Sequence, residues 1–290
     1  MLQRAAALLR AGMPSQQIWD RLGDESAASF ELTSIADAVK LGMLVSDALA
    51  QQDAPEWRVI AATWAVAERS GAPLAGALDR IASALRSLEQ LDARRQVLLA
   101  GPRSTVRLVI VLPPVVLLFG SILGFDTWTM LMSPLGMIGV CAGGALLGIA
   151  HWWSNTIISR VASQENAAGF ALDLTSIHLQ GGSSSARAVR EVVDCVDAAG
   201  AAWISLADLA HDGVVQRTLA EADGLGSSRV RLLLAAADTA RRTRAGELES
   251  ETERLSTRIL VPLGACVLPA FILMGALPVV LSMVQSVDFA

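Results

Sequence analysis

The sequence predicts an all-α membrane protein with two homologous cytoplasmic helical-bundle domains and three transmembrane helices. Of its 290 residues, 53% are apolar and 18% are charged, a balance that is atypical of a soluble protein of this size. The apolar residues gather in three long runs that are almost free of charge. Outside these runs, apolar residues recur at intervals of three or four, the spacing of an amphipathic helix.

Residues 1–105 are predicted to form the first cytoplasmic domain. One helical stripe in it consists of Leu74, Leu78, Ile81, Leu85 and Leu88. Three glycine-containing segments separate such stripes, namely 10–14, 40–44 and 69–74. Glycine readily adopts the left-handed conformation that ends a helix, and proline is tolerated in the first turn of the next helix. We therefore expect antiparallel helices joined by short corners.

Residues 106–155 are predicted to form a transmembrane hairpin. Its two spans cover about 108–125 and 134–153, and as helices they would extend about 27 Å and about 30 Å. Between Arg107 and Arg160 the only charged residue is Asp126, which lies in a short polar turn. Each span is therefore long enough to cross the apolar core of a bilayer.

Residues 156–258 repeat the pattern of the first domain less cleanly, and we interpret them as the second cytoplasmic domain. Corners are expected at 180–182 and 212–213, and the helix that starts near Ser228 is expected to run on toward the membrane. Residues 259–290 are predicted to form the third transmembrane helix and a short exterior tail, because 259–287 contains no charge.

The placement of charge predicts the orientation in the membrane. Arg107 precedes the first span, Arg160 follows the second and Arg258 precedes the third. Basic residues in short loops resist translocation, whereas the hairpin turn and the tail carry only Asp126 and Asp288. We expect a multi-pass protein of the inner (cell) membrane with a cytoplasmic N-terminus and an exterior C-terminus.

Charge and motif content argue against several classes of function. The net charge is −5 and the pI about 5.3, whereas nucleic-acid binding needs a surplus of basic charge, so no nucleic-acid partner is expected. The only lysine, Lys40, is followed by Leu41, which excludes the Gly-Lys-Ser/Thr ending of a P-loop. No dinucleotide fingerprint, nucleophile elbow or zinc-ligand spacing is present. We expect no enzyme, no catalytic, cofactor-binding or metal-binding residues, and no cofactor.

Small residues and prolines in the apolar runs are the candidate sites inside the membrane. Glycines at intervals of four let helices approach closely, and the candidates are Gly120, Gly124, Gly139, Gly143, Gly144 and Gly148. They fit packing within the hairpin or an oligomeric seam. Prolines remove backbone hydrogen bonds, and the candidates are Pro262, Pro269 and Pro278. They fit ordinary kinks or a path that guides pilin helices.

Charged residues near the corners and before the third span are candidates for docking a partner. They are Arg10, Glu68, Arg69, Arg244, Glu247 and Glu251. Residues 247, 251 and 254 follow helical spacing, so a solvated helix face explains this group as well as a docking surface does. The three histidines, at 151, 178 and 211, lie in separate segments and are interpreted as surface or packing residues.

Three segments carry a resemblance to a known family. LLRAGMPSQQIWDRL (8–22), AERSGAPLAGALDRIASALR (67–86) and VPLGACVLPAFILMGALPVVLSMV (261–284), together with the hairpin, resemble the type II secretion system F family, and within it the tight-adherence (Flp pilus) branch. The resemblance implies an inner-membrane platform protein that works with membrane lipid, a cytoplasmic hexameric ATPase, a second platform protein of the same family or another copy of itself, and pilin subunits.

One alternative function remains open at this point. A permease-type transporter subunit coupled to a nucleotide-binding partner would also combine cytoplasmic helices with membrane spans. Three spans without an intramembrane charged pair are a poor path for a solute, although a dimer would supply six.

Overall fold

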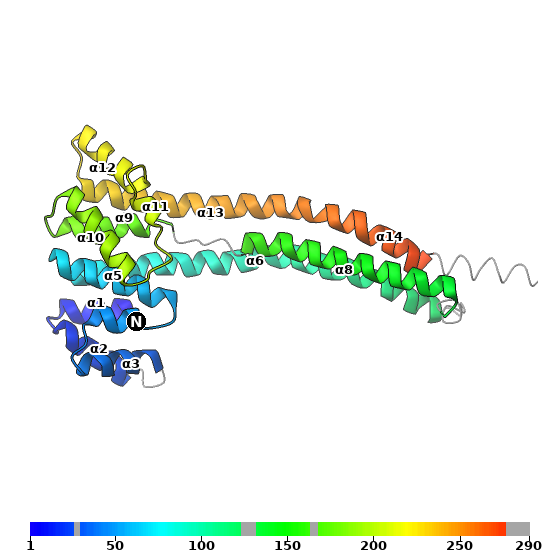
Figure 1. Ribbon diagram of the computed structural model, residues 1–290, viewed down its shortest axis with the longest axis horizontal. Helices are drawn as coiled ribbons and strands as arrows, with labels where there is room; N and C mark the ends of the chain where they lie inside the picture. Colours follow the sequence, from blue (N-terminus) through cyan, green and yellow to red (C-terminus); the bar gives the residue numbers. More distant parts are fainter. Residues whose placement is uncertain (26–29, 123–131, 163–167, 277–290) are drawn as a thin grey trace, which may run out of the picture. The chain divides into compact units, whose positions relative to one another are not determined.

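The computed structural model describes residues 1–25, 30–122, 132–162 and 168–276. Every regular element in those ranges is a helix. The chain divides into two compact units, one formed by Met1–Leu91 and Glu165–Ala245, the other by Asp92–Gln164 and Gly246–Ala290. The helices are labelled in Figure 1. This agrees with the predicted all-α fold.

The first unit is built from short helices and the first parts of two long ones. The short helices are α1 (Leu2–Arg10), α2 (Ser15–Glu25), α3 (Phe30–Lys40), α4 (Val45–Ala50), α5 (Pro55–Ser70), α9 (Phe170–Gln180), α10 (Ser185–Ala198), α11 (Leu206–Leu209) and α12 (Val214–Leu225). The long helices are α6 (Leu74–Ile122) and α13 (Arg229–Pro262), and each contributes residues to both units.

The corner between α5 and α6 shows how the sequence sets the turns. Helix α5 ends at Ser70, Gly71 has a φ of 72°, and the N–H of Ala72 donates to the carbonyl of Ala67 at 3.1 Å. Only glycine adopts this left-handed backbone without strain, so the chain can reverse within three residues. Pro73 then accepts the first hydrogen bond of α6. The predicted corners at 10–14 and 40–44 likewise place a glycine with positive φ between two helices.

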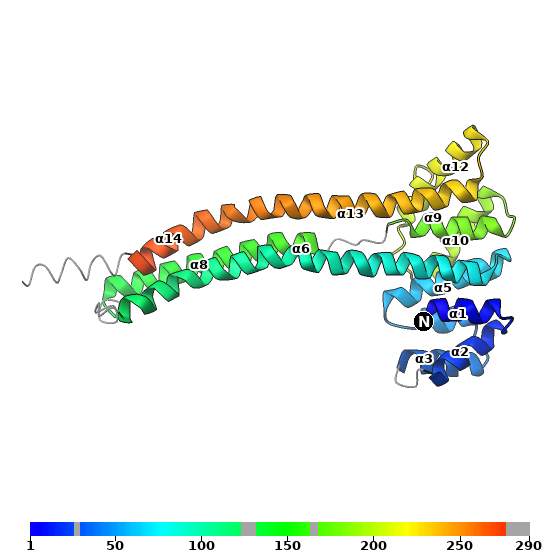
Figure 2. The same cartoon turned by 180° about the vertical axis from the view of Figure 1, so that it is seen from behind.

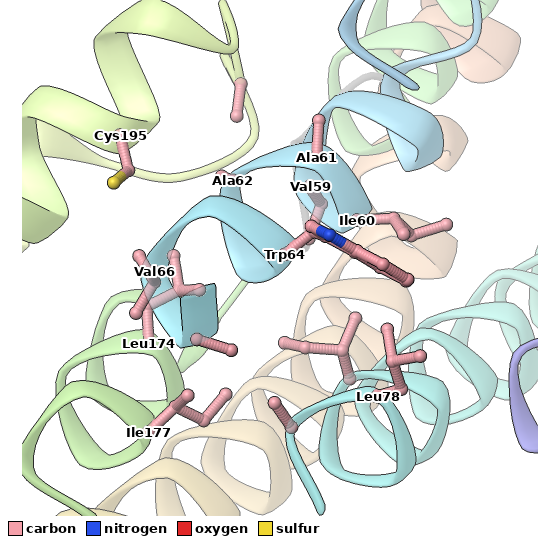
Figure 3. Packing of buried hydrophobic residues seen from close by; sticks show 14 of the residues in the cluster. Val59, Ile60, Ala61, Ala62, Trp64, Val66, Leu78, Leu174, Ile177 and Cys195 are labelled. Carbon is pink, nitrogen blue, oxygen red and sulfur yellow. The ribbon is translucent and has the colours of Figure 1, made fainter. Parts of the chain in front are cut away.

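One apolar core holds the first unit together. Figure 3 shows part of it, with Trp64 and Ile60 of α5, Leu78 of α6, and Leu174 and Ile177 of α9. Leu78, Ile81 and Leu85 of the predicted stripe are buried, and the stripe's two ends pack against the same cluster. The core therefore joins residues from both predicted cytoplasmic domains.

The predicted division into two bundles at 1–105 and 156–258 is not confirmed. Helix α5, from the first range, contacts both α9 and α10, from the second. Arg58 of α5 also donates to the carbonyl of Gly200 at 3.5 Å. Residues 1–91 and 165–245 form a single compact unit, because neither set covers its apolar faces alone. Homology between the two ranges stays a prediction.

The second unit contains the apolar helices. Besides the later parts of α6 and α13, it holds α8 (Pro134–Ala162), the π-helical η1 (Leu263–Val267), α14 (Leu268–Phe271) and the π-helical η2 (Ile272–Ala276). Three helices are long and apolar enough to cross a membrane, within Leu74–Val116, Gly136–Ser159 and Arg229–Met274. Figure 2 shows α6, α8 and the end of α13 side by side, and their buried residues form one cluster.

The number of candidate spans agrees with the prediction. The helix that contains the first predicted span is continuous from Leu74. The helix that leads into the third is continuous from Arg229, as expected for a helix that starts near Ser228 and runs on toward the membrane. The membrane-adjacent charges therefore lie on the same helices as the apolar runs. Asp126 and the tail after Ala276 lie outside the described residues.

Candidate functional site: a buried charge network in the first unit

Four charged side chains from three helices form a closed network inside the first unit. Arg80 Nε of α6 donates to Asp173 Oδ1 of α9 at 2.7 Å, and another Arg80 nitrogen donates to Asp238 Oδ1 of α13 at 2.8 Å. Arg241 of α13 donates to Asp173 Oδ2 and, at 3.3 Å, to Asp238 Oδ1. Two cations and two anions thus balance, and α6, α9 and α13 are tied at one point.

Asp173 is the centre of this network. Its side chain is 0% exposed, against 22% for Arg80, 15% for Arg241 and 48% for Asp238. Burial raises the pKa of the Asp173 carboxyl, and the attraction of Arg241 and Arg80 opposes that rise. A carboxylate without solvent needs hydrogen-bond donors and compensating positive charge, so the two guanidinium groups are a condition for burying it.

The local sequence explains why an acid is buried here. Every residue of α9 from Phe170 to His178 is buried, so the helix has no solvent face on which Asp173 could lie. The hydroxyls of Thr175 and Ser176 donate to carbonyls within α9, at 2.8 Å each. The Arg241 guanidinium lies 5.9 Å from the centre of the Phe170 ring, a cation–π contact.

A second contact brings two glycine corners of the first unit together. A Cβ added at Gly181 would overlap the carbonyl oxygen of Ser70 and lie 2.7 Å from its carbonyl carbon. The corner that follows α9 therefore rests directly on the backbone that ends α5. Next to it, the buried His178 has one ring nitrogen 2.7 Å from Ser183 Oγ and the other 2.6 Å from Glu191 Oε2. His178 is thus a packing residue with both nitrogens satisfied.

Glu191 joins His178 to Arg187 at this corner. Its other carboxylate oxygen accepts from Arg187 Nε at 2.7 Å. The hydrogen bonds from Arg187 and His178 hold the pKa of Glu191 below its ordinary value. Among the residues that the structure describes, no group of three or more His, Cys, Asp or Glu is placed to hold a metal ion.

The candidate glycines fall into different environments. A Cβ at Gly143 would overlap the Met274 side chain, with its Sδ at 2.6 Å, and a Cβ at Gly139 would lie 3.3 Å from the carbonyl of Leu273. Both face the last helix rather than the first half of the hairpin. A Cβ added at Gly144 or at Gly148 would have no neighbouring atom within 4 Å. Gly120 lies in α6, and Gly124 is outside the described residues.

The candidate prolines lie beside the irregular part of the last helix. Pro262 ends α13 directly before η1, and Pro269 lies in α14 between the two π segments. Pro269 lacks the N–H that an α-helix would direct to the carbonyl of Ala265, which lies in η1. Pro278 is outside the described residues.

The candidate docking residues lie at separate places. Arg10, at the end of α1, forms an ion pair with Asp79 of α6, and Glu68 and Arg69 are exposed at the end of α5. Arg244, Glu247 and Glu251 lie along α13, where Glu247 is exposed and the other two are half-buried. Arg10 is exposed as well, so the accessible corner residues are 10, 68 and 69, of which only Arg10 has an ion pair described above.

Sequence reasoning missed Asp173 and Arg80. The signal was available, because Asp173 interrupts an otherwise apolar segment, FALDLTSI, that is too hydrophobic to expose one polar face. A lone acid in such a helix requires a cation from another element. Arg80 could not be chosen from among 23 basic residues without the fold.

The N-terminal part of the chain matches a known family. Residues 1–122 match the family model described as protein F of the type II secretion system. Residues 1–122 are therefore similar to the F domain of that family. The matched segment covers α1 to α6, including the 69–74 corner and Arg80. No curated protein shows a significant match to the chain.

The match favours a coarse statement of class. The matched family is typical of platform proteins of secretion and pilus-assembly machines, and the match together with three apolar helices among the described residues suggests a multi-pass protein of the inner membrane. Residues 123–290 lie beyond the matched part, so the resemblance noted at 261–284 is not confirmed by it.

Proposed function

We propose that this protein is an inner-membrane platform protein of the tight-adherence branch, which couples a cytoplasmic hexameric ATPase to the assembly of pilins into a Flp-type filament. The similarity of residues 1–122 to the F domain is the observation that carries the proposal. The resemblance of segments 8–22 and 67–86 supports the tight-adherence branch. The protein itself hydrolyses nothing and supplies a mechanical connection.

The two long helices support this mechanical role. Helices α6 and α13 each contribute residues to both units without interruption, at Leu91–Asp92 and at Ala245–Gly246. Rigid elements of this kind carry coupling between distant sites. The charge network fastens both helices to α9 within the first unit, so a push on that unit would act on α6 and α13 together.

The proposal includes a docking surface and an orientation in the membrane. The corner residues Arg10, Glu68 and Arg69 and the α13 residues Arg244, Glu247 and Glu251 form the candidate surface for the ATPase or for a second platform protein. Glu68 and Arg69 are exposed, which suits this role. The flanking arginines favour a cytoplasmic N-terminus and an exterior C-terminus.

A capture experiment tests the partnership. The detergent-solubilised chain should retain a secretion-type ATPase, and exchanging the charges with Glu68→Arg and Arg69→Glu should reduce capture. The matched control is the same exchange at Asp223 and Arg229, an exposed ion pair in the same unit. Capture of a solute-binding partner, or nucleotide turnover by the pure chain, would contradict the proposal. A reporter enzyme fused after Ala290 should be active only outside the cytoplasm.

The glycines of α8 offer a second test with an internal control. Gly143→Leu would drive a side chain into Met274, and we expect filament assembly to fall while membrane insertion continues. Gly144→Leu adds the same side chain where nothing lies within 4 Å, and it should assemble normally. If both variants assemble like the native chain, close contact at this seam is not needed for function.

A further inference from the structure

We propose that a groove between α6 and α8 binds the headgroup of an anionic phospholipid. The groove has a volume of about 360 Å³ and lies within the second unit. Its lining consists of Val106, Arg107, Ile110, Val111, His151, Asn155 and Ile158. The inference rests on the membrane crossing of these helices, and not on the role in pilus assembly.

The groove is lined by both polar and apolar side chains. Arg107, His151 and Asn155 are exposed and carry nitrogen donors, and none of the described lining residues is a carboxylate. Val106 and Ile158 are buried and Ile110 is half-buried, so they form an apolar wall. A guanidinium with nearby amide and imidazole donors matches a phosphate diester, and the apolar wall matches the glycerol and acyl chains attached to it.

The place of the groove along the helices supports a lipid rather than a soluble phosphate. Arg107 is the last charged residue before the first apolar run, and His151 lies at the end of the second. Both positions correspond to the headgroup region of a bilayer. Trp152 and Trp153, which follow His151, are 71% and 41% exposed, as expected for aromatic residues that contact the interface. Basic pockets between membrane helices at this level suit anionic headgroups.

The test is a lipid-binding measurement on the full chain, delipidated in a non-ionic detergent. Native mass spectrometry and thermal unfolding would compare phosphatidylglycerol with phosphatidylcholine of the same acyl chains. We expect preferential retention of phosphatidylglycerol and a higher unfolding midpoint with it. Arg107→Gln should weaken that lipid's apparent Kd about tenfold, the usual effect of losing one charged hydrogen bond.

Two further variants separate the groove from general charge attraction. Arg258→Gln removes an exposed arginine next to the third apolar run but outside the groove, and it should leave the preference unchanged. Val111→Trp fills the groove while keeping Arg107, and it should reduce retention. Val111 is 49% exposed, so the larger side chain does not disturb the buried cluster.

Several outcomes would overturn the proposal. Equal retention of the two lipids, or equal loss in Arg107→Gln and Arg258→Gln, would show that no headgroup site exists. Stabilisation by glycerol phosphate or inorganic phosphate as strong as that by the lipid would assign the groove to a soluble anion. A dimer that Val111→Trp disperses would assign it to a second copy of the chain.

Discussion

Removing one cation from the buried network tests whether Asp173 depends on it. In Arg80→Met the side chain keeps a similar length and packing, but Asp173 retains only Arg241 as a cation. Removing one partner of a fully buried ion pair costs about 3–5 kcal/mol. Arg80 is 22% exposed and Arg241 still pairs, so we expect a loss of about 3 kcal/mol. For a unit of about 150–250 residues this lowers the unfolding midpoint by roughly 6–12 °C.

The pH dependence of that loss identifies its cause. Burial raises the pKa of Asp173 in the folded state, so the folded protein binds this proton more tightly than the unfolded chain does. Without Arg80 the pKa rises further. The destabilisation should therefore be largest at neutral pH, and it should shrink as the pH falls through the folded-state pKa of Asp173 in the variant toward its lower folded-state pKa in the native chain.

Circular dichroism in detergent would follow unfolding of the native chain and the variants at several pH values. The control is Arg229→Met, which breaks an exposed pair with Asp223 and should cost less than about 1 kcal/mol. If Arg80→Met unfolds within about 1 °C of that control at neutral pH, the network contributes no more than a surface ion pair. The reasoning from burial would then be wrong.

Two further predictions concern the glycine corner of α9. Gly181→Val places a side chain on the Ser70 carbonyl and should destabilise the first unit by about 1–3 kcal/mol in thermal unfolding, whereas Gly224→Ala, in open space within α12, should be neutral or slightly stabilising. Equal midpoints for these two variants would contradict the contact. Glu191 contributes stability above the ordinary glutamate pKa of 4.5, and this is lost as the pH falls through its lowered folded-state pKa. Glu191→Gln should flatten the acid side of the stability curve, and an unchanged slope would exclude this carboxylate as its source.

Local signals predicted the helices and corners correctly. The 69–74 corner contains a glycine for the left-handed residue and a proline directly before the next helix, whose carbonyl accepts that helix's first hydrogen bond. Helical periodicity alone was enough to predict that Leu78, Ile81 and Leu85 are buried in a core. Length and the absence of charge were enough to predict that the three apolar runs form helices able to span a membrane.

Long-range partners could not be predicted in the same way. An apolar stripe indicates that one face of a helix is buried, but it does not indicate which element covers that face. The sequence pattern therefore assigned helix α9 to a second domain, whereas it packs against α5, which lies about 100 residues earlier in the chain. Glycine spacing likewise predicted a close approach in α8, but only the fold assigns Gly139 and Gly143 to the last helix. The partners of Asp173 depend on the same long-range packing.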